Sequence, residues 1–211
     1  MEIKKVCVAG GGLMGRQIAL NSAIYGYELY LTDKSPEVCD AVVKWADEYL
    51  AGRIEKGRLT EEQVQSTKAR FNVVKSLTDA AKDADLVIEA IVEVLDIKRS
   101  FFKELDPLLR KDTIIATNSS YMVSSNFADC VSNPGRLANA HYYNPALVMK
   151  LVEVVQGPHT DEATAAALMD FLKKTGKTPI WMKKEIDGFV ANRFIRVIND
   201  QAFYLDRKSV V

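Results

Sequence analysis

The sequence lacks several features that would place it in other classes of protein. Only three cysteines occur in 211 residues. Cys7, Cys39 and Cys130 lie far apart, with neither a CxxC motif nor a Cys/His metal spacing, so we expect reduced cysteines, no disulfide framework and no metal site. No stretch approaches about 18 consecutive apolar residues, and the N-terminal apolar run is too short for a signal peptide. These absences predict a cytoplasmic protein without membrane contact.

An excess of charge of either sign is also missing. Lys plus Arg and Asp plus Glu number 28 each. No overall field therefore attracts nucleic acid or an anionic membrane, and we expect neither as a partner. With 48% hydrophobic residues, a chain of this length can bury a core. Length alone favours one domain, or one domain and a fragment of another.

Apolar runs rich in Val, Ile and Leu alternate with stretches of helical period. Runs of this kind are typical of strands buried on both faces. The alternation predicts an α/β fold of the Rossmann type, with a doubly wound, mostly parallel sheet. The expected strands are Lys5 to Ala9, Glu28 to Thr32, Leu86 to Ile88, Thr113 to Thr117 and Leu137 to His141.

A long polar excursion separates the second expected strand from the third. It opens with Ser35 as a helix cap and Pro36 as the first helical residue. A second helix is expected from Thr60, where Thr60 and Gln63 have the form of a capping box. The excursion is therefore predicted to be an inserted helical hairpin, whose first helix has the apolar positions Val38, Val42, Trp45, Tyr49 and Ile54.

The strongest chemical signal follows the first strand, where Gly10, Gly12 and Gly15 form a G-x-G-x-x-G motif that runs into a helix. Gly10 permits the tight turn, Gly12 lets a pyrophosphate approach the backbone, and Gly15 lets helix and strand pack closely. Leu13 and Met14 belong to the same loop and are expected to contact the cofactor. The glycines alone are a weak signal, but this strand-to-helix context predicts a dinucleotide site at the helix N-terminus.

Asp33 ends the second strand, 18 residues beyond Gly15, where an acid accepts hydrogen bonds from the adenosine ribose. A carboxylate about 4 Å from the 2'-phosphate of NADP would be repelled by several kcal/mol at an effective dielectric of about 20. NAD is therefore the expected cofactor, although the nearby Lys34 and Arg16 could soften the preference. The alternative is that Asp33 only caps the turn before Ser35.

Four further stretches, in order and spacing, resemble the 3-hydroxyacyl-CoA and 3-hydroxybutyryl-CoA dehydrogenase family. They are Glu89-Ala-Ile-Val-Glu93, Asn118-Ser-Ser120, His141-Tyr-Tyr-Asn144-Pro with Lys-Leu-Val-Glu153, and Asp187-Gly-Phe-Val-Ala-Asn192. The resemblance extends from the first residues to about Leu205. Because several separated motifs agree, it is more specific than the glycine loop.

Oxidation of a secondary alcohol by hydride transfer requires a base for the hydroxyl proton, and an imidazole suits this role. Of two histidines, His159 follows Gly157-Pro158 and is expected in a solvated surface turn. His141 ends an apolar strand on the side where doubly wound sheets bind ligands. From the residues alone it could be an ordinary core histidine, but the resemblance implies that His141 and Glu153 are the catalytic dyad.

The resemblance also implies polar contacts to the substrate. Ser120 and Asn192 match positions that bind the reacting 3-oxygen, and Asn144 lies in the histidine motif. Each could orient that oxygen toward His141. The alternatives are that Ser120 caps a short helix and that Asn192 belongs to a polar helix face.

Other matched positions concern the cofactor and coenzyme A. Glu93 and Lys98 match positions that face the cofactor ribose, and Asn118 matches one near the nicotinamide. The alternative for these residues is a helix start and its solvated face. Lys56, in the hairpin, falls where the family places a lysine on the CoA phosphates. Tyr49 stands at a position where the resemblance leads us to expect a small polar residue.

The end of the chain departs most from the resemblance. We expect an NAD-binding domain over residues 1–184, and over 185–205 the first helix of a truncated all-helical domain. Residues 206–211 match no expected continuation and are interpreted as a non-native tail, because a reading frame of a common sequencing adapter encodes them. The segment from Gly188 to Leu205 contains apolar residues that the remaining helices would cover, so we expect a homo-oligomer formed through it. These residues are Phe189, Val190, Phe194, Ile195, Val197, Ile198, Phe203, Tyr204 and Leu205.

The expected activity is hydride transfer between NAD and C3 of a 3-hydroxyacyl-CoA or 3-ketoacyl-CoA, in fatty-acid β-oxidation or butyrate-type metabolism. An acyl-CoA is then the expected substrate. Two alternatives stay open from the sequence. One is a non-catalytic relative that binds NAD without turnover, and the other is an NAD enzyme of the gulonate dehydrogenase branch acting on free hydroxy acids.

Overall fold

Eight strands form one sheet in the computed structural model, which describes residues 2–208. Their order is β3-β2-β1-β4-β5-β6-β7-β8, and all neighbours are parallel except β6 and β7. The strands are β1 (Lys5–Ala9), β2 (Glu28–Thr32), β3 (Phe71–Val73), β4 (Leu86–Glu89), β5 (Ile114–Thr117), β6 (Leu137–Tyr142), β7 (Leu151–Val155) and β8 (Thr178–Met182). The α/β, doubly wound fold is therefore confirmed.

The five expected strands are confirmed with boundaries that shift by at most one residue. The inner strand β7 was not predicted, and neither were the two edge strands, β3 and β8. These two edge strands have no fully buried residue, so the continuous apolar signal of an inner strand is absent. Pro179 in β8 is also typical of an edge strand, because proline cannot donate to a neighbour.

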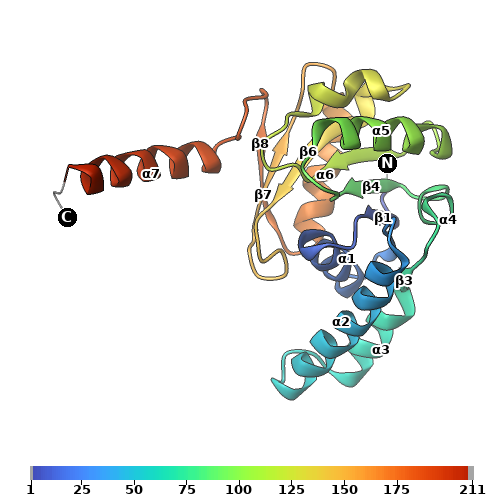
Figure 1. Ribbon diagram of the computed structural model, residues 1–211. Helices are drawn as coiled ribbons and strands as arrows, with labels where there is room; N and C mark the ends of the chain where they lie inside the picture. The colour runs from blue at the N-terminus through green and yellow to red at the C-terminus, as the bar shows by residue number, and fades with distance from the viewer. Residues whose placement is uncertain (1, 209–211) are drawn as a thin grey trace.

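Helices cover both faces of the sheet (Figure 1). One face packs Val6 and Val8 against Ile18 of α1 and Leu168 of α6, and the other packs Cys7 against Phe102 of α5. Successive residues of β1 thus point to opposite faces, as strand geometry requires. The longer helices are α1 (Leu13–Ile24), α2 (Pro36–Glu55), α3 (Glu61–Arg70), α5 (Leu95–Leu105), α6 (Glu162–Lys174) and α7 (Ala191–Arg207), and α4 (Leu77–Ala81) is short.

The inserted hairpin consists of α2 and α3, which extend beyond the sheet in Figure 1. Ser35 caps α2, and its hydroxyl accepts from Val38 N at 3.3 Å. Thr60 and Gln63 form a reciprocal capping box at the start of α3. Both predicted helix starts are confirmed, because these local hydrogen bonds depend on neighbouring residues alone.

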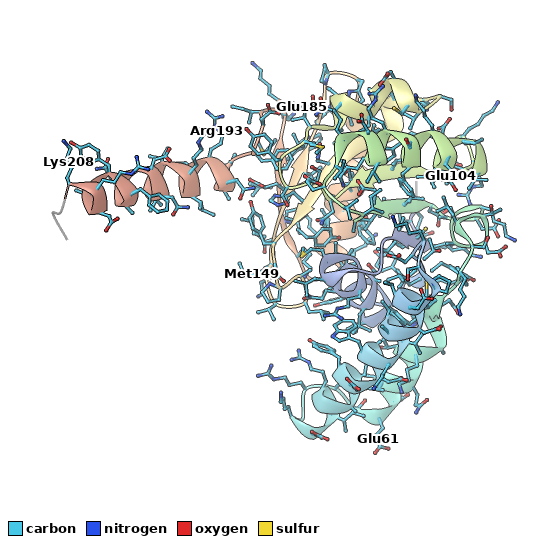
Figure 2. All side chains as sticks on the ribbon, viewed as in Figure 1. Glu61, Glu104, Met149, Glu185, Arg193 and Lys208 are labelled. Atoms are coloured by element: carbon cyan, nitrogen blue, oxygen red, sulfur yellow. The ribbon has the colours of Figure 1, made fainter. Side chains whose placement is uncertain are left out.

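The last helix, α7, projects away from the rest of the protein (Figure 1). None of its residues is buried, and its side chains from Arg193 to Lys208 have no other element against them (Figure 2). Phe189, expected to be exposed, is instead fully buried just before the helix. Residues 206 and 207 continue α7, whereas residues 209–211 of the predicted tail lie outside the described residues. None of the described helices has the length and apolarity needed to cross a membrane.

Candidate active site

The glycine loop joins β1 to α1, and Gly10 and Gly15 are each required there for a steric reason. Gly10 has a φ of 108°, and a Cβ there would lie 2.5 Å from the Ala90 carbonyl oxygen. A Cβ on Gly15 would lie 1.8 Å from the Gly10 carbonyl oxygen, so α1 could not pack as closely on β1. At Gly12 nothing lies within 4 Å of an added Cβ. The loop therefore leaves open space at Gly12, in front of the N-terminus of α1.

That open space belongs to a cleft of about 950 Å³ at the carboxyl ends of β1 and β4. The chain continues from β1 to β2 on one side and from β4 to β5 on the other, so the strand order reverses between β1 and β4. Doubly wound folds bind ligands at such a reversal. The cleft is also lined by Lys75, Ile97 and Phe101, which the motifs did not single out. Of the residues expected at the cofactor or substrate, Gly10, Gly12, Leu13, Met14, Asp33, Glu93, Lys98, Asn118 and Ser120 line it.

Asp33 holds the turn before Ser35 and also lies at the cleft, whereas its contact with a ribose stays a prediction. It lines the cleft. One carboxylate oxygen accepts from Gly11 N at 2.7 Å, and the other accepts from Ser35 N at 2.9 Å. The side chain thus fixes the glycine loop against the start of α2 while it contributes a negative charge to the cleft wall.

A buried ion pair lies beneath the cleft. Lys98 is 1% exposed, and its ammonium is 2.5 Å from Glu89 Oε1 and 3.2 Å from Glu93 Oε2. The alternative that Lys98 belongs to a solvated helix face is therefore wrong. Glu89 is fully buried and also accepts from Ile91 N at 2.8 Å and from the Thr117 hydroxyl at 2.6 Å. Motif matching gave Glu89 no role, although a carboxylate at the end of an apolar strand was a usable signal.

Asn118 and Glu93 connect this ion pair to the rest of the site. The Asn118 side-chain oxygen accepts from Tyr142 N at 2.9 Å, which links the cleft wall to the end of β6. Glu93 accepts from the Ser119 hydroxyl and from Ser120 N. Burial raises the pKa of Glu93, but the Ser119 hydrogen bond and the charge of Lys98 bring the net pKa below its usual value.

His141 and Glu153 are direct cross-strand partners in the antiparallel pair β6 and β7. His141 Nδ1 lies 2.8 Å from Glu153 Oε2, and the two side chains are 4% and 0% exposed. The structure thus brings together two residues that are twelve positions apart, because the β6–β7 register places them opposite each other. The ring of Phe189 packs on the imidazole with a centroid separation of 5.3 Å.

Four donors surround the Glu153 carboxylate. Oε2 accepts from His141 and from the Tyr143 hydroxyl, whereas Oε1 accepts from Val190 N at 3.0 Å and Ala191 N at 3.1 Å at the start of α7. Burial raises the pKa of Glu153, but these hydrogen bonds outweigh it and hold the pKa below its usual value. Glu153 is therefore a carboxylate that stays ionised beside the imidazole.

The other histidine has different surroundings. His159 lies in a turn, as expected, but it is half-buried, with Nε2 at 3.4 Å from the Ser124 hydroxyl, so the expectation of a solvated side chain is wrong. Burial lowers the pKa of His159, and the nearby Glu185 only partly opposes this. His159 does not line the cleft beside the glycine loop.

The residues expected at the substrate do not all lie together. The Asn192 amide donates to the backbone carbonyl of Ser120 at 2.9 Å, which brings these two positions together across 72 residues. Asn144 is exposed and precedes Pro145 through a cis peptide bond. Lys56 follows the end of α2 at the tip of the hairpin and is exposed, away from the residues that line the cleft.

The fold and the cleft together define a dinucleotide-binding domain of the oxidoreductase type, and the Asn118–Tyr142 hydrogen bond links the cleft wall to the strand that holds His141. Comparison with known proteins gives the family. Residues 5–186 match the family model described as 3-hydroxyacyl-CoA dehydrogenase, NAD binding domain. The chain belongs to this family, and NAD is its cofactor.

Three relatives illustrate the similarity. The chain is 39% identical to a probable 3-hydroxybutyryl-CoA dehydrogenase of Bacillus subtilis, over 97% of this chain and 70% of that protein. It is 37% identical to the human mitochondrial hydroxyacyl-coenzyme A dehydrogenase, over 92% of this chain and 63% of that enzyme. The crystal structure of a (S)-3-hydroxybutyryl-CoA dehydrogenase from Ralstonia eutropha superposes with a TM-score of 0.95 at 33% identity, over all of this chain and 74% of that one. The chain thus spans roughly two thirds to three quarters of these relatives.

Proposed function

We propose that this chain supplies the cofactor-binding and proton-transfer groups of an NAD-dependent 3-hydroxyacyl-CoA dehydrogenase, which interconverts 3-hydroxyacyl-CoA and 3-ketoacyl-CoA in β-oxidation or butyrate-type metabolism. The observation that supports this most is the buried contact of His141 with Glu153 at 2.8 Å, beside a cleft that suits a dinucleotide. When bound, NAD accepts or returns the hydride at C3.

The cleft suits NAD for reasons specific to this chain. The space at Gly12 admits a pyrophosphate to the backbone, and the N-terminus of α1 offers unpaired N–H groups and a positive dipole end. Asp33 would accept from the adenosine ribose hydroxyls. Glu93, Lys98 and Asn118, with the loop residues Leu13 and Met14, would line the ribose and nicotinamide portions.

His141 is proposed as the base, and the hydrogen bonds decide which nitrogen acts. An ionised carboxylate only accepts, so the proton between His141 Nδ1 and Glu153 must lie on Nδ1. Nε2 then carries a free lone pair, which takes the hydroxyl proton of a 3-hydroxyacyl group. Glu153 holds the ring and stabilises the imidazolium that forms, and the reverse reaction returns the proton.

Substrate binding is assigned to residues beside this pair. Ser120, Asn144 and Asn192 would hydrogen-bond the 3-oxygen and aim it at His141 Nε2. Lys56, exposed at the hairpin tip, would pair with a CoA phosphate. We further propose that residues 1–184 form the NAD-binding domain and that 185–205 begin a helical domain, a division supported by the lack of buried residues in α7.

We also propose that the chain forms a homo-oligomer through α7. Phe194, Val197 and Ile198 are each more than 60% exposed. At about 25 cal/mol per Å², covering several hundred Å² of such surface would strongly favour association. Light scattering should show a species larger than one chain, and Val197→Glu should shift it toward the monomer. A monodisperse monomer of the unmodified chain would contradict this proposal.

A reducing compartment such as the cytoplasm is the proposed location. All three cysteines are buried and free of disulfides. Burial raises the pKa of the Cys7 thiol to about 12, which leaves it unreactive. Free thiols of this kind suit a reducing environment.

The proposed activity is tested by following NADH absorbance with acetoacetyl-CoA and with longer 3-ketoacyl-CoAs. The assay should use the chain alone and the chain fused to the remaining C-terminal part of the Bacillus subtilis relative. Oxidation of NADH with the CoA thioesters but not with free acetoacetate is the expected result. Turnover of free hydroxy or keto acids only, or NADH binding without turnover in either form, would contradict the proposal.

A further inference from the structure

Tyr143 contacts the dyad without being part of the proposed proton transfer. Its hydroxyl donates to Glu153 Oε2 at 2.6 Å, and its ring lies 4.6 Å from the imidazole between centroids. We propose that Tyr143 is a positioning residue that lowers the basicity of His141 by sharing the same oxygen of Glu153. No motif in the sequence pointed to this role.

Both oxygens of Glu153 have a full set of donors. Oε1 faces the two backbone N–H groups at the start of α7, and Oε2 faces one hydrogen from His141 and one from Tyr143. Among the described residues, His141 and Tyr143 are the ionisable groups that hydrogen-bond to Glu153, and the segment before α7 adds the apolar Phe189. The charge on Oε2 is therefore divided between one imidazole and one phenol.

The phenol remains a donor in this position. Burial and the hydrogen bond to Glu153 both raise the pKa of Tyr143, so its proton stays in place over the working pH range. A hydrogen bond to the charged carboxylate leaves less negative charge to stabilise the imidazolium. Removing the hydroxyl would leave the negative charge of Oε2 to interact with His141 alone and would strengthen that interaction.

The role of Tyr143 rests on the proposed function, in which His141 is the base. Alcohol oxidation needs a neutral imidazole, and ketone reduction needs an imidazolium. By taking part of the charge of Glu153 Oε2, Tyr143 would weaken the stabilisation of the imidazolium and extend the oxidation range toward lower pH. The residue thus tunes which direction is favoured at a given pH, without contacting the substrate.

Imidazole NMR measures the effect without any turnover. The chain has two histidines, so the ¹⁵N signals of His141 and His159 can be assigned with a single His159→Gln variant. In Tyr143→Phe the His141 midpoint should rise by roughly half a unit to one unit, while the His159 midpoint stays constant and shows that the fold is intact. Tyr142→Phe, which removes a hydroxyl from the neighbouring core residue, is the matched control and should leave both midpoints unchanged.

A second variant tests the opposite direction. Tyr143→3-fluorotyrosine keeps the ring and strengthens the hydroxyl as a donor, so the His141 midpoint should fall. An unchanged His141 midpoint in both Tyr143 variants, or an equal shift in Tyr142→Phe, would overturn the inference. If the chain turns over, the low-pH limb of kcat/KM for oxidation should move with the NMR midpoint. If the chain shows no turnover, the proposed function fails, while the NMR titrations still decide the role of Tyr143.

Discussion

Two carboxylates are completely buried in this sheet, and they hold basic side chains of different kinds. Glu89, in β4, pairs with Lys98 at 2.5 Å, and Glu153, in β7, pairs with His141 at 2.8 Å. Each also accepts hydrogen bonds from a backbone N–H and a hydroxyl group. The two sites are therefore similar in burial and in donors, and they differ in the basic side chain that each carboxylate contacts.

The difference between lysine and histidine indicates which of the two pairs is suited to proton transfer. A lysine normally keeps its proton far above neutral pH, whereas an imidazole gains and loses one near it. The Glu89 pair is thus a fixed charge arrangement that supports the cofactor cleft. In the proposed function, the Glu153 pair passes a proton and returns to its starting state.

The largest effect should come from removing the titrating partner. In a form of the protein with measurable turnover, His141→Ala should lower kcat by roughly 100 to 10,000-fold, the usual contribution of a positioned base. NADH affinity, measured by fluorescence titration, should change little, because His141 does not line the cofactor cleft. Turnover within a few-fold of the parent would show that His141 is not the base.

Removing the fixed cation should instead affect folding. Lys98→Met leaves the Glu89 charge buried without its counterion and should cost about 3 to 5 kcal/mol in the free energy of unfolding. Denaturant titration followed by circular dichroism measures this. The double variant Glu89→Gln with Lys98→Met should recover most of the loss, since no buried charge remains. A single variant as stable as the parent would remove the contrast between the two carboxylates.

A third carboxylate, Asp33, tests the cofactor end with a smaller expected effect. The unmodified chain should bind NADH more tightly than NADPH, because a carboxylate about 4 Å from a 2'-phosphate is repelled. Asp33→Asn removes the charge and keeps one oxygen that can accept from Gly11 or Ser35, so it should narrow the preference by roughly tenfold or more. Equal affinities of the parent for both cofactors would contradict this reading.

The last comparison concerns a buried lysine without a carboxylate. Lys177 is 8% exposed, and its ammonium donates to the carbonyls of Ala146 and Met149. Burial lowers the pKa of Lys177 from 10.5 to about 8. Between these two pH values the unfolded chain binds more protons than the folded one, so Lys177 should make the free energy of unfolding rise as pH increases.

Lys177→Met isolates this contribution from other titrating groups. Urea unfolding at pH 7.5 and pH 10 should show a smaller gain in stability for the variant than for the parent. An identical pH dependence in the two proteins would mean that Lys177 is not desolvated as the structure indicates.

Much of this protein could be predicted from the sequence where local rules suffice. Five of the six inner strands, the caps at Ser35 and Thr60 and the glycine loop depend on residues close in the chain, and these predictions are confirmed. The strands β3, β7 and β8, the burial of Phe189 and the surroundings of His159 were missed or wrong. Each of these depends on contacts between segments far apart in sequence.

The sequence by itself determined the doubly wound fold, the dinucleotide loop and the identity of the candidate base, because hydrophobic period, glycine spacing and motif order are properties of the chain. Only the tertiary structure decided how that base is held. The β6–β7 register places Glu153 beside His141, and the start of α7 supplies two donors to the same carboxylate. Such contacts arise from strand pairing and chain packing over long separations, which residue types and local spacing do not specify.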